Sequence, residues 1–220
     1  MSDSPAPSPL IVATGLTLAT ARGTVFHPVT TDIPPGAVVA VIGADGTGKS
    51  AFLLALAGRM RGIEGELQVD GIDAIASPGH VRKITSVARI SDLVVAEPKL
   101  SLEDCITERT LADAAPARQR HATYLRAALL MGLDEPRSTL FGQLSPADQT
   151  RAAVALACIR PAPLIVLDDI DRETTLADQA DLWADLLRLA ADGHTIVAAT
   201  SERTAVPQDV LTIEMDPRHG

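Results

Sequence analysis

Residues 43–58 read GADGTGKSAFLLALAG and are the most informative segment of the sequence. It has the pattern G-x-x-x-x-G-K-[ST], in which the backbone N–H groups of a glycine-rich loop bind phosphate oxygens at the start of a helix. The apolar run AVVAVI at 37–42 precedes the loop and is typical of a strand that is buried on both faces of a parallel sheet. The residues after the loop, 50–57, predict a helix that ends at Gly58. Because strand, loop and helix come in the order that the pattern requires, we expect a nucleotide-binding site here.

The loop supplies the phosphate-binding groups of this predicted site. Its glycines allow backbone conformations, and a close approach to a ligand, that a Cβ would hinder. Lys49 is expected to neutralise the terminal phosphates, and the Ser50 hydroxyl is expected to ligate Mg²⁺. The predicted nucleotide contacts in this segment are Gly43, Ala44, Asp45, Gly46, Thr47, Gly48, Lys49, Ser50 and Ala51.

Two carboxylates supply the other half of such a site. The segment LIVLDD at 164–169 is a short apolar strand followed directly by two acids. We predict that Asp168 completes the metal shell and that Asp169 orients or deprotonates an attacking water, so that Asp169 and Lys49 are the catalytic candidates. Taken alone, two acids after a strand fit the start of a loop or a helix cap equally well.

Composition narrows the class of protein. The chain has 220 residues and a net charge of -9, which argues against a non-specific nucleic-acid binder. No apolar run is long enough to cross a bilayer, and the N-terminus MSDSPAPSPL lacks the features of a secretory signal. The two cysteines, Cys105 and Cys158, have no metal-ligand spacing. We therefore expect reduced thiols in a cytoplasmic protein, with Cys158 in the core.

The remaining pattern indicates an α/β fold. Residues 10–33 contain short β-like stretches, and 65–72 has the alternation of a half-exposed antiparallel strand. Residues 101–160 carry apolar residues at helical spacing. Further strands are expected at 163–169, 194–200 and 210–215, with an amphipathic helix at 176–193 between the first two. Strands that alternate with helices around a phosphate loop indicate a largely parallel sheet.

Two other classes of nucleotide-binding protein share such a phosphate loop. Guanine-specific GTPases read their base with an N-K-x-D segment, and this chain contains no asparagine. Small-molecule kinases stay open as an alternative, although no arginine-rich lid is evident in the sequence.

The order and spacing of the motifs resemble those of the ATP-binding cassette (ABC) ATPases over residues 10–202. The segment from Ile33 to Ala74 resembles the family's opening, and PKLSLEDCITER resembles the start of its helical lobe. The block GLDEPRSTLFGQLSPADQTRAAVALACIRPAPLIVLDDID resembles its signature and second phosphate-site motif. The resemblance implies a P-loop NTPase fold of ABC type, with a mixed, mostly parallel sheet, an N-terminal antiparallel β part and a helical lobe. It divides the chain into a disordered lead-in at 1–9, a core with the β part at 10–88, a helical lobe at 89–160 and the rest of the core at 161–220, as one ABC domain over 10–216.

The resemblance also implies a function. Members of this family bind Mg-ATP, so ATP and Mg²⁺ are the expected cofactors. They act as cytoplasmic subunits at the inner face of a membrane, coupled to a separate permease-like protein. Two cassettes close head to tail, so we expect a homodimer or a heterodimer with another ABC subunit, and no nucleic-acid partner. A non-transport regulatory module that binds ATP without turnover is the alternative within the family.

The signature motif departs from the family pattern. Where the family has LSGGQ, residues 144–148 read LSPAD. Ser145 remains a predicted contact to the nucleotide of a partner cassette, but Pro146 has no N–H, so one donor is lost. The same residues also suit a helix start without any ligand, with Ser145 as N-cap, Pro146 in the first turn and Asp148 near the positive end of the dipole.

Three further positions hold residues that differ from those with which the family acts on the γ-phosphate. The family's catalytic glutamate aligns with Asp169, which is one methylene shorter, its metal-linked glutamine aligns near Arg89, and its switch histidine aligns with Ser201. No aromatic residue precedes the first turn, where the family stacks adenine. Losing one preorganised transition-state group typically costs about two to three orders of magnitude in rate. We therefore expect hydrolysis that is weak or depends on a partner.

Overall fold

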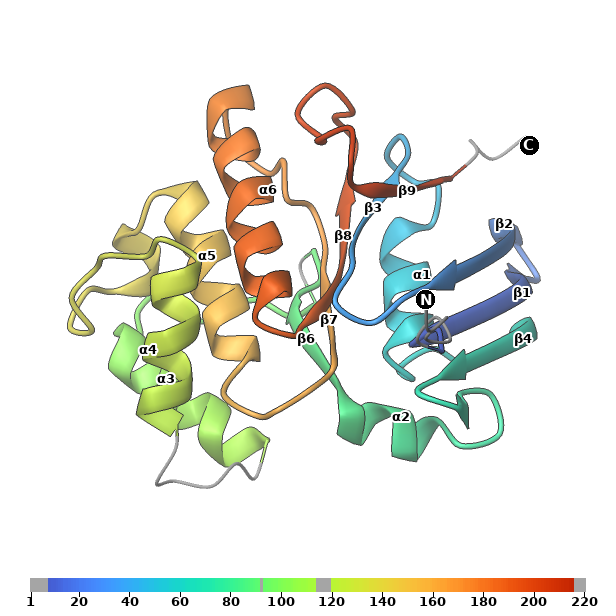
Figure 1. The fold of residues 1–220 in the computed structure, drawn as a ribbon, viewed down its shortest axis with the longest axis horizontal. Helices are drawn as coiled ribbons and strands as arrows, with labels where there is room; N and C mark the ends of the chain where they lie inside the picture. The colour runs from blue at the N-terminus through green and yellow to red at the C-terminus, as the bar shows by residue number, and fades with distance from the viewer. Residues whose placement is uncertain (1–7, 92, 114–119, 216–220) are drawn as a thin grey trace, which may run out of the picture.

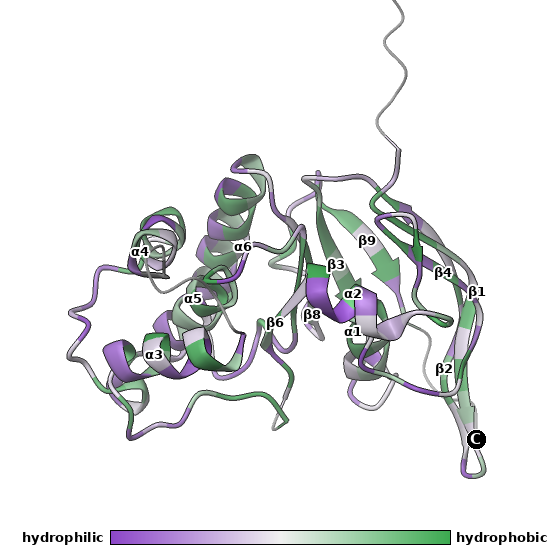
Figure 2. Cartoon of the chain, turned by 90° about the horizontal axis from the view of Figure 1, so that it is seen from below, coloured by the Kyte–Doolittle hydropathy of each residue, from purple (hydrophilic) through white to green (hydrophobic). Residues whose placement is uncertain are grey.

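Two β-sheets and a group of helices make up the computed structural model, which describes residues 8–91, 93–113 and 120–215. One sheet has four antiparallel strands in the order β2-β1-β4-β5, and the other has five strands in the order β6-β7-β8-β3-β9. Helices α3 to α6 gather on one side of the five-stranded sheet, and the antiparallel sheet lies on the other side (Figures 1 and 2). The predicted α/β class, with an antiparallel part and a helical part, is confirmed.

The antiparallel sheet comes from the first half of the chain. Its strands are β1 (Ile11–Thr20), β2 (Gly23–Ile33), β4 (Ile63–Val69) and β5 (Ile72–Asp73). Strand β1 lies in the middle and pairs with both β2 and β4. Leu67 and Val69 are buried, whereas Glu66 and Gln68 are exposed. This period of two explains why an alternating segment forms a half-exposed strand.

The five-stranded sheet is parallel at every pairing. Its strands are β3 (Val38–Ile42), β6 (Thr85–Arg89), β7 (Leu164–Leu167), β8 (Thr195–Thr200) and β9 (Leu211–Glu214). Every residue of β3, β6, β7 and β8 is buried, and continuous burial is the reason that three of them read as apolar runs. Strand β6 is not among the strands predicted from the sequence, because three of its five residues are polar and it lacks the apolar run of a buried strand.

The helices are α1 (Lys49–Leu56), α2 (Pro78–Ile84), α3 (Leu102–Ala112), α4 (Arg120–Leu130), α5 (Pro146–Ala157) and α6 (Leu176–Ala191), with a short 3₁₀ turn at Phe141–Gln143. Capping boxes start α3 and α6, in which Ser101 pairs with Asp104 and Thr175 with Asp178. Within the described ranges, no helix has the length and apolar character that a membrane crossing requires.

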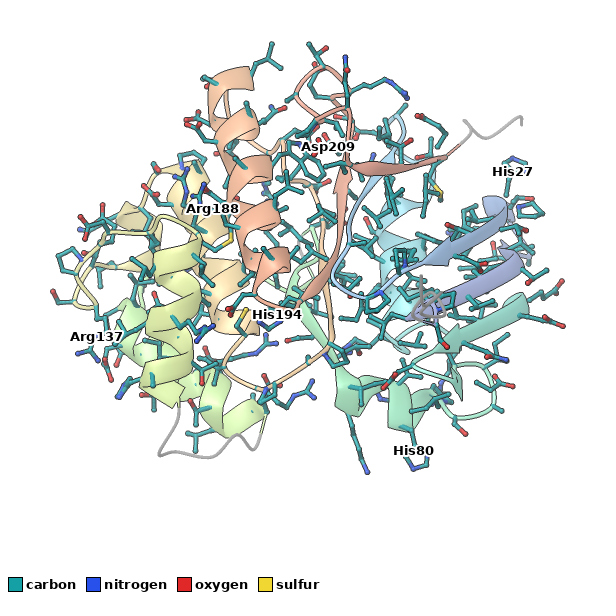
Figure 3. All side chains as sticks on the ribbon, viewed as in Figure 1. His27, His80, Arg137, Arg188, His194 and Asp209 are labelled. Carbon is teal, nitrogen blue, oxygen red and sulfur yellow. The ribbon has the colours of Figure 1, made fainter. Side chains whose placement is uncertain are left out.

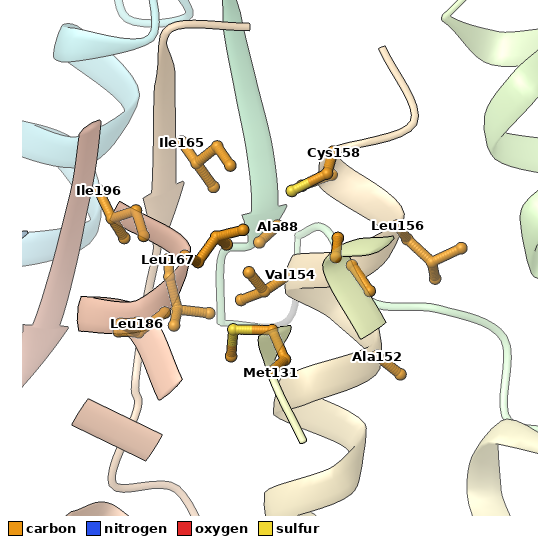
Figure 4. Packing of buried hydrophobic residues seen from close by; sticks show 14 of the residues in the cluster. Ala88, Met131, Ala152, Val154, Leu156, Cys158, Ile165, Leu167, Leu186 and Ile196 are labelled. Carbon is orange, nitrogen blue, oxygen red and sulfur yellow. The ribbon is translucent and has the colours of Figure 1, made fainter. Parts of the chain in front are cut away.

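Side chains of β7 alternate between two cores. Ile165 and Leu167 face the helices, where they pack with Val154 and Leu186, as Figure 4 shows. Leu164 and Val166 belong to the core on the other side, which α1 fills between the two sheets. Cys158 is buried in the helical core, as predicted.

The parallel pairing decides where a site can form. Strands β3, β6, β7 and β8 are neighbours and run in one direction, so the loops that leave their carboxyl ends lie at one edge of the sheet. In open α/β sheets this edge is where ligands bind.

Candidate nucleotide-binding site

The glycine-rich loop after β3 is held in a left-handed conformation. Gly46 has φ +79° and Gly48 has φ +93°. A Cβ on Gly48 would lie 2.3 Å from the carbonyl oxygen of Val25, whereas a Cβ on Gly46 would meet no atom within 4 Å. Gly48 therefore packs against β2, and Gly46 borders open space that a ligand can enter. No side chain caps the start of α1, which leaves its first turn to a ligand such as phosphate.

Lys49 is folded back under this loop. Its side chain is only 6% exposed, and Nζ donates hydrogen bonds to the carbonyl oxygens of Gly43 at 2.7 Å and Ala44 at 3.1 Å. The Thr47 hydroxyl also donates to the Ala44 carbonyl, at 2.9 Å. Asp45 lies 3.9 Å from Nζ, but its side chain is fully exposed, so water screens its charge. The positive charge of the buried Lys49 ammonium is therefore largely uncompensated beneath the loop.

A cleft of about 670 Å³ opens in front of the loop. Asp45, Gly46, Gly48, Lys49, Ser50 and Ala51 of the predicted contacts line it, whereas Gly43, Ala44 and Thr47 shape the loop without lining the cleft. The other lining residues are Val25, Ser91, Asp169, Asp171, Arg172 and Ser201. No histidine belongs to this lining, and the labelled His27, His80 and His194 lie well apart from one another in Figure 3.

A facing group of four oxygen-bearing side chains lies at the cleft: Ser50 at the start of α1, and Ser91, Asp168 and Asp169 from the segments after β6 and β7. Ser91 Oγ lies 2.8 Å from Asp168 Oδ2 and 3.1 Å from Asp169 Oδ2, so its hydroxyl can donate to either carboxylate. Ser50 Oγ lies 3.4 Å from Ser91 Oγ. Burial, and then the charge of Asp168, raise the pKa of Asp169. The structure thus brings together the predicted metal ligands Ser50 and Asp168 and the predicted catalytic Asp169.

Ser91 is not among the residues predicted from the sequence. It follows β6 by two residues, and a polar residue just past a buried strand is the signal that would have identified it if β6 had been recognised.

Arg89, near which the resemblance aligns the family's glutamine, is 8% exposed and points into the protein. Its Nη2 donates to the carbonyl oxygen of Asp169 at 2.5 Å, and Nε and Nη2 both lie 3.3 Å from the carbonyl oxygen of Asp168. Nη1 donates to Thr150 Oγ1 on α5 at 3.0 Å. Burial is the chief reason that the pKa of Arg89 is lowered. The guanidinium therefore joins β6, the segment after β7 and α5.

Ser201 and Ser145 are engaged by nearby acids. The backbone N–H of Ser201 donates to Asp171 Oδ2 at 2.9 Å, and its hydroxyl donates to the same oxygen. Ser145 caps α5: its hydroxyl donates to Asp148 Oδ2 at 2.6 Å and accepts from the Asp148 N–H at 3.1 Å. The helix-cap interpretation is confirmed, and Ser145 does not line the cleft of its own chain.

The chemistry of the cleft fits a phosphate chain with a hard cation. The loop and Lys49 offer N–H donors and positive charge on one wall. The hydroxyls and carboxylates of the facing group are the oxygen ligands that Mg²⁺ prefers. An adenine-stacking aromatic is absent from the lining, in which Val25 is the largest apolar side chain.

Sequence comparisons point to one family. Residues 26–171 match the model of the ABC transporter family. A putative ABC transporter ATP-binding protein of Streptomyces avermitilis is 34% identical over 210 residues, which cover 90% of this chain but 35% of that protein. The thiamine import ATP-binding protein ThiQ of Cereibacter sphaeroides is 33% identical, with 76% of this chain and 71% of that protein covered.

Solved structures agree on the fold. A dimeric bacterial ABC transporter cassette superposes with a TM-score of 0.73 at 21% identity, covering 93% of this chain and 94% of the other. A subunit from Clostridium perfringens described as part of an ABC transporter complex gives a TM-score of 0.74 at 17% identity, covering 89% and 79%. The chain therefore belongs to the ABC transporter family, as one of its ATP-binding cassettes.

Proposed function

We propose that this chain is the ATP-binding subunit of an ABC transporter-like complex, which binds Mg-ATP and couples it to a separate membrane component. One observation carries the proposal: Lys49, Ser50, Ser91 and Asp169 line one cleft, and the buried Asp168 carboxylate accepts a hydrogen bond from Ser91 beside it. Relatives that are named import ATP-binding proteins support the transport role over the kinase and the non-transport alternatives.

Each site residue then has a role. The loop from Gly43 to Ser50 and the Lys49 ammonium bind the phosphates, and Ser50 and Asp168 hold Mg²⁺. The cation, when bound, neutralises phosphate charge and fixes the orientation of the phosphate chain. Asp169 orients the attacking water, because it lines the cleft with the loop residues, whereas the other carboxylate of the facing group, Asp168, does not.

We also infer that the chain on its own turns over ATP slowly. Asp169 shares the Ser91 hydroxyl with Asp168, Arg89 is committed to backbone carbonyls and Thr150, and Ser201 is bonded to Asp171. The resemblance aligns Asp169, Arg89 and Ser201 with a glutamate, a glutamine and a histidine of the family. Asp169 is one methylene shorter than the glutamate, and the other two lack the functional chemistry of the residues that they replace. A partner cassette with an intact signature would supply the missing contacts.

The surface for the membrane component is a groove between the segment after Ser91 and helices α3 and α5. It encloses about 300 Å³, and Leu93 and Val95 at its rim are 74% and 52% exposed. Exposed large apolar side chains beside a groove mark an interaction site. Residues 93–96, which line the groove, begin two residues after Ser91, which lines the nucleotide cleft. A segment of the membrane protein bound in the groove would therefore contact residues next to the nucleotide site. We infer that the chain acts at the cytoplasmic face of the membrane.

Nucleotide binding by the wild type and by Lys49→Met tests the first part. We expect a fluorescent ATP analogue to bind the wild type with Mg²⁺, and to lose at least about tenfold in affinity in Lys49→Met, because a charge-assisted hydrogen bond to phosphate is lost. The exposed Lys99→Met is the matched control and should bind as the wild type does. Equal binding by all three would refute the site. ATP turnover by the purified chain alone at rates ordinary for the family would refute slow hydrolysis.

Co-purification tests the partner surface. Leu93→Asp should lose the membrane component from detergent extracts while nucleotide binding is unchanged. Leu129→Asp on α4 removes an equally exposed leucine outside the groove and should keep the partner. Loss in both variants, or in neither, would argue against this groove.

A further inference from the structure

We propose that Ser91 is a ligand of the divalent cation in the nucleotide site, in place of the side chain at the glutamine position. The inference rests on the proposed function, because it concerns the cation that accompanies the nucleotide. It assigns to Ser91 a role that neither its sequence context nor the family pattern gives it.

The placement of oxygens carries the proposal. Ser91 Oγ lies 2.8 Å and 3.1 Å from one carboxylate oxygen each of Asp168 and Asp169, and 3.4 Å from Ser50 Oγ. These four side chains come from three segments: the start of α1, the residues after β6 and the residues after β7. Two carboxylates and a second hydroxyl within 3.4 Å of the Ser91 hydroxyl make, together with it, a suitable oxygen set for a hard cation. Without a cation, the Ser91 hydroxyl donates to the carboxylates; with one, it can rotate and present a lone pair.

The backbone holds Ser91 at this point in an unusual conformation. Ser91 has φ +33° and Asp169 has φ +49°, both in the region that favours glycine. Hydrogen bonds between Ile90 and Val94 in both directions close the turn that contains Ser91. Two non-glycine residues with positive φ, hydrogen-bonded to each other beside a cleft, are typical of a functional site where strain is maintained by its surroundings.

Arg89 cannot take this role. A guanidinium has no acceptor and cannot ligate a cation. All three of its nitrogens are occupied by the carbonyl oxygens of Asp168 and Asp169 and by Thr150. The two functions of the family's glutamine are thus divided: Arg89 makes the link to α5, and Ser91 faces the cation.

Manganese binding tests this assignment directly. Free Mn²⁺ is measured by electron paramagnetic resonance in the presence of a non-hydrolysable ATP analogue, and binding of the analogue is measured separately in EDTA. Ser91→Ala should weaken Mn²⁺ binding about tenfold and leave analogue binding in EDTA within about twofold of the wild type. Ser201→Ala is the matched control, because Ser201 lines the same cleft but bonds to Asp171. It should leave both affinities unchanged.

Two more variants separate ligation from folding. Ser91→Gly accepts the positive φ without strain and should lose Mn²⁺ affinity as the alanine variant does. Ser91→Cys should shift the preference from Mn²⁺ toward Cd²⁺ by at least about tenfold, since thiolates favour softer metals, whereas Ser201→Cys should not. Wild-type Mn²⁺ affinity in Ser91→Ala and Ser91→Gly, with no cadmium preference in Ser91→Cys, would overturn the assignment. A wild type that binds no analogue with or without Mn²⁺ would instead overturn the proposed function.

Discussion

Replacing Gly48 by alanine should destabilise the fold much more than the same change at Gly46, two residues earlier in the loop. Both glycines have a left-handed φ, so each substitution carries a backbone cost of about 1–2 kcal/mol. Only at Gly48 does the new Cβ collide with the protein. It would lie 2.3 Å from the Val25 carbonyl oxygen and 2.9 Å from Phe26 Cβ, where ordinary contact begins at 3.4 Å.

The collision cannot be relieved cheaply, because Val25 contributes backbone and Phe26 is fully buried. Overpacking of this kind adds about 1–3 kcal/mol. For a chain of this size, that difference corresponds to a melting temperature about 2–12 °C lower in Gly48→Ala than in Gly46→Ala. Circular dichroism melting without nucleotide measures it. Equal melting temperatures, or a lower one for Gly46→Ala, would refute the argument that Gly48 is required by its contact with β2.

Three further predictions concern other parts of the molecule. Arg89→Met should lower the free energy of unfolding in urea by about 2–4 kcal/mol, since buried carbonyl oxygens lose their donors; a change below about 0.5 kcal/mol would contradict this. Val25→Tyr should tighten binding of an ATP analogue about tenfold by stacking on the base, and unchanged affinity in a competition titration would argue against a base at this wall. Asp178→Asn should destabilise at neutral pH and not in strong acid. The Thr175 N–H and hydroxyl lower the pKa of Asp178, so its contribution is present above the ordinary aspartate pKa and disappears as the pH falls through the lowered one. A urea midpoint difference that is independent of pH would contradict the capping role.

Features that depend on short stretches of chain could be predicted from the sequence. The strand before the loop, the loop and α1 are contiguous, and Gly48 at the helix start follows from the motif. The cap of α5 was predictable for the same reason, since Ser145 and Asp148 are three residues apart.

Strand β6 could not be predicted, because its polar residues are buried by partners from far along the chain. Ser86 accepts from Arg109, 23 residues away, and Arg89 reaches Thr150 and the Asp168 carbonyl at separations of 61 and 79 residues. A local pattern contains none of these partners, so a buried polar strand looks like a loop. Ser91 was missed with it, because its place in the site depends on where β6 ends.

The Arg89 guanidinium has a mechanical consequence. It donates hydrogen bonds to Thr150 on α5 and to the backbone carbonyl oxygens of Asp168 and Asp169, so one planar group connects α5 to the residues that carry the two carboxylates. Displacing α5 while these bonds persist must also move Asp168 and Asp169 relative to the phosphate loop. If the proposed membrane component displaces α5, the spacing of the oxygens around the proposed cation would therefore change without any direct contact between that component and the site.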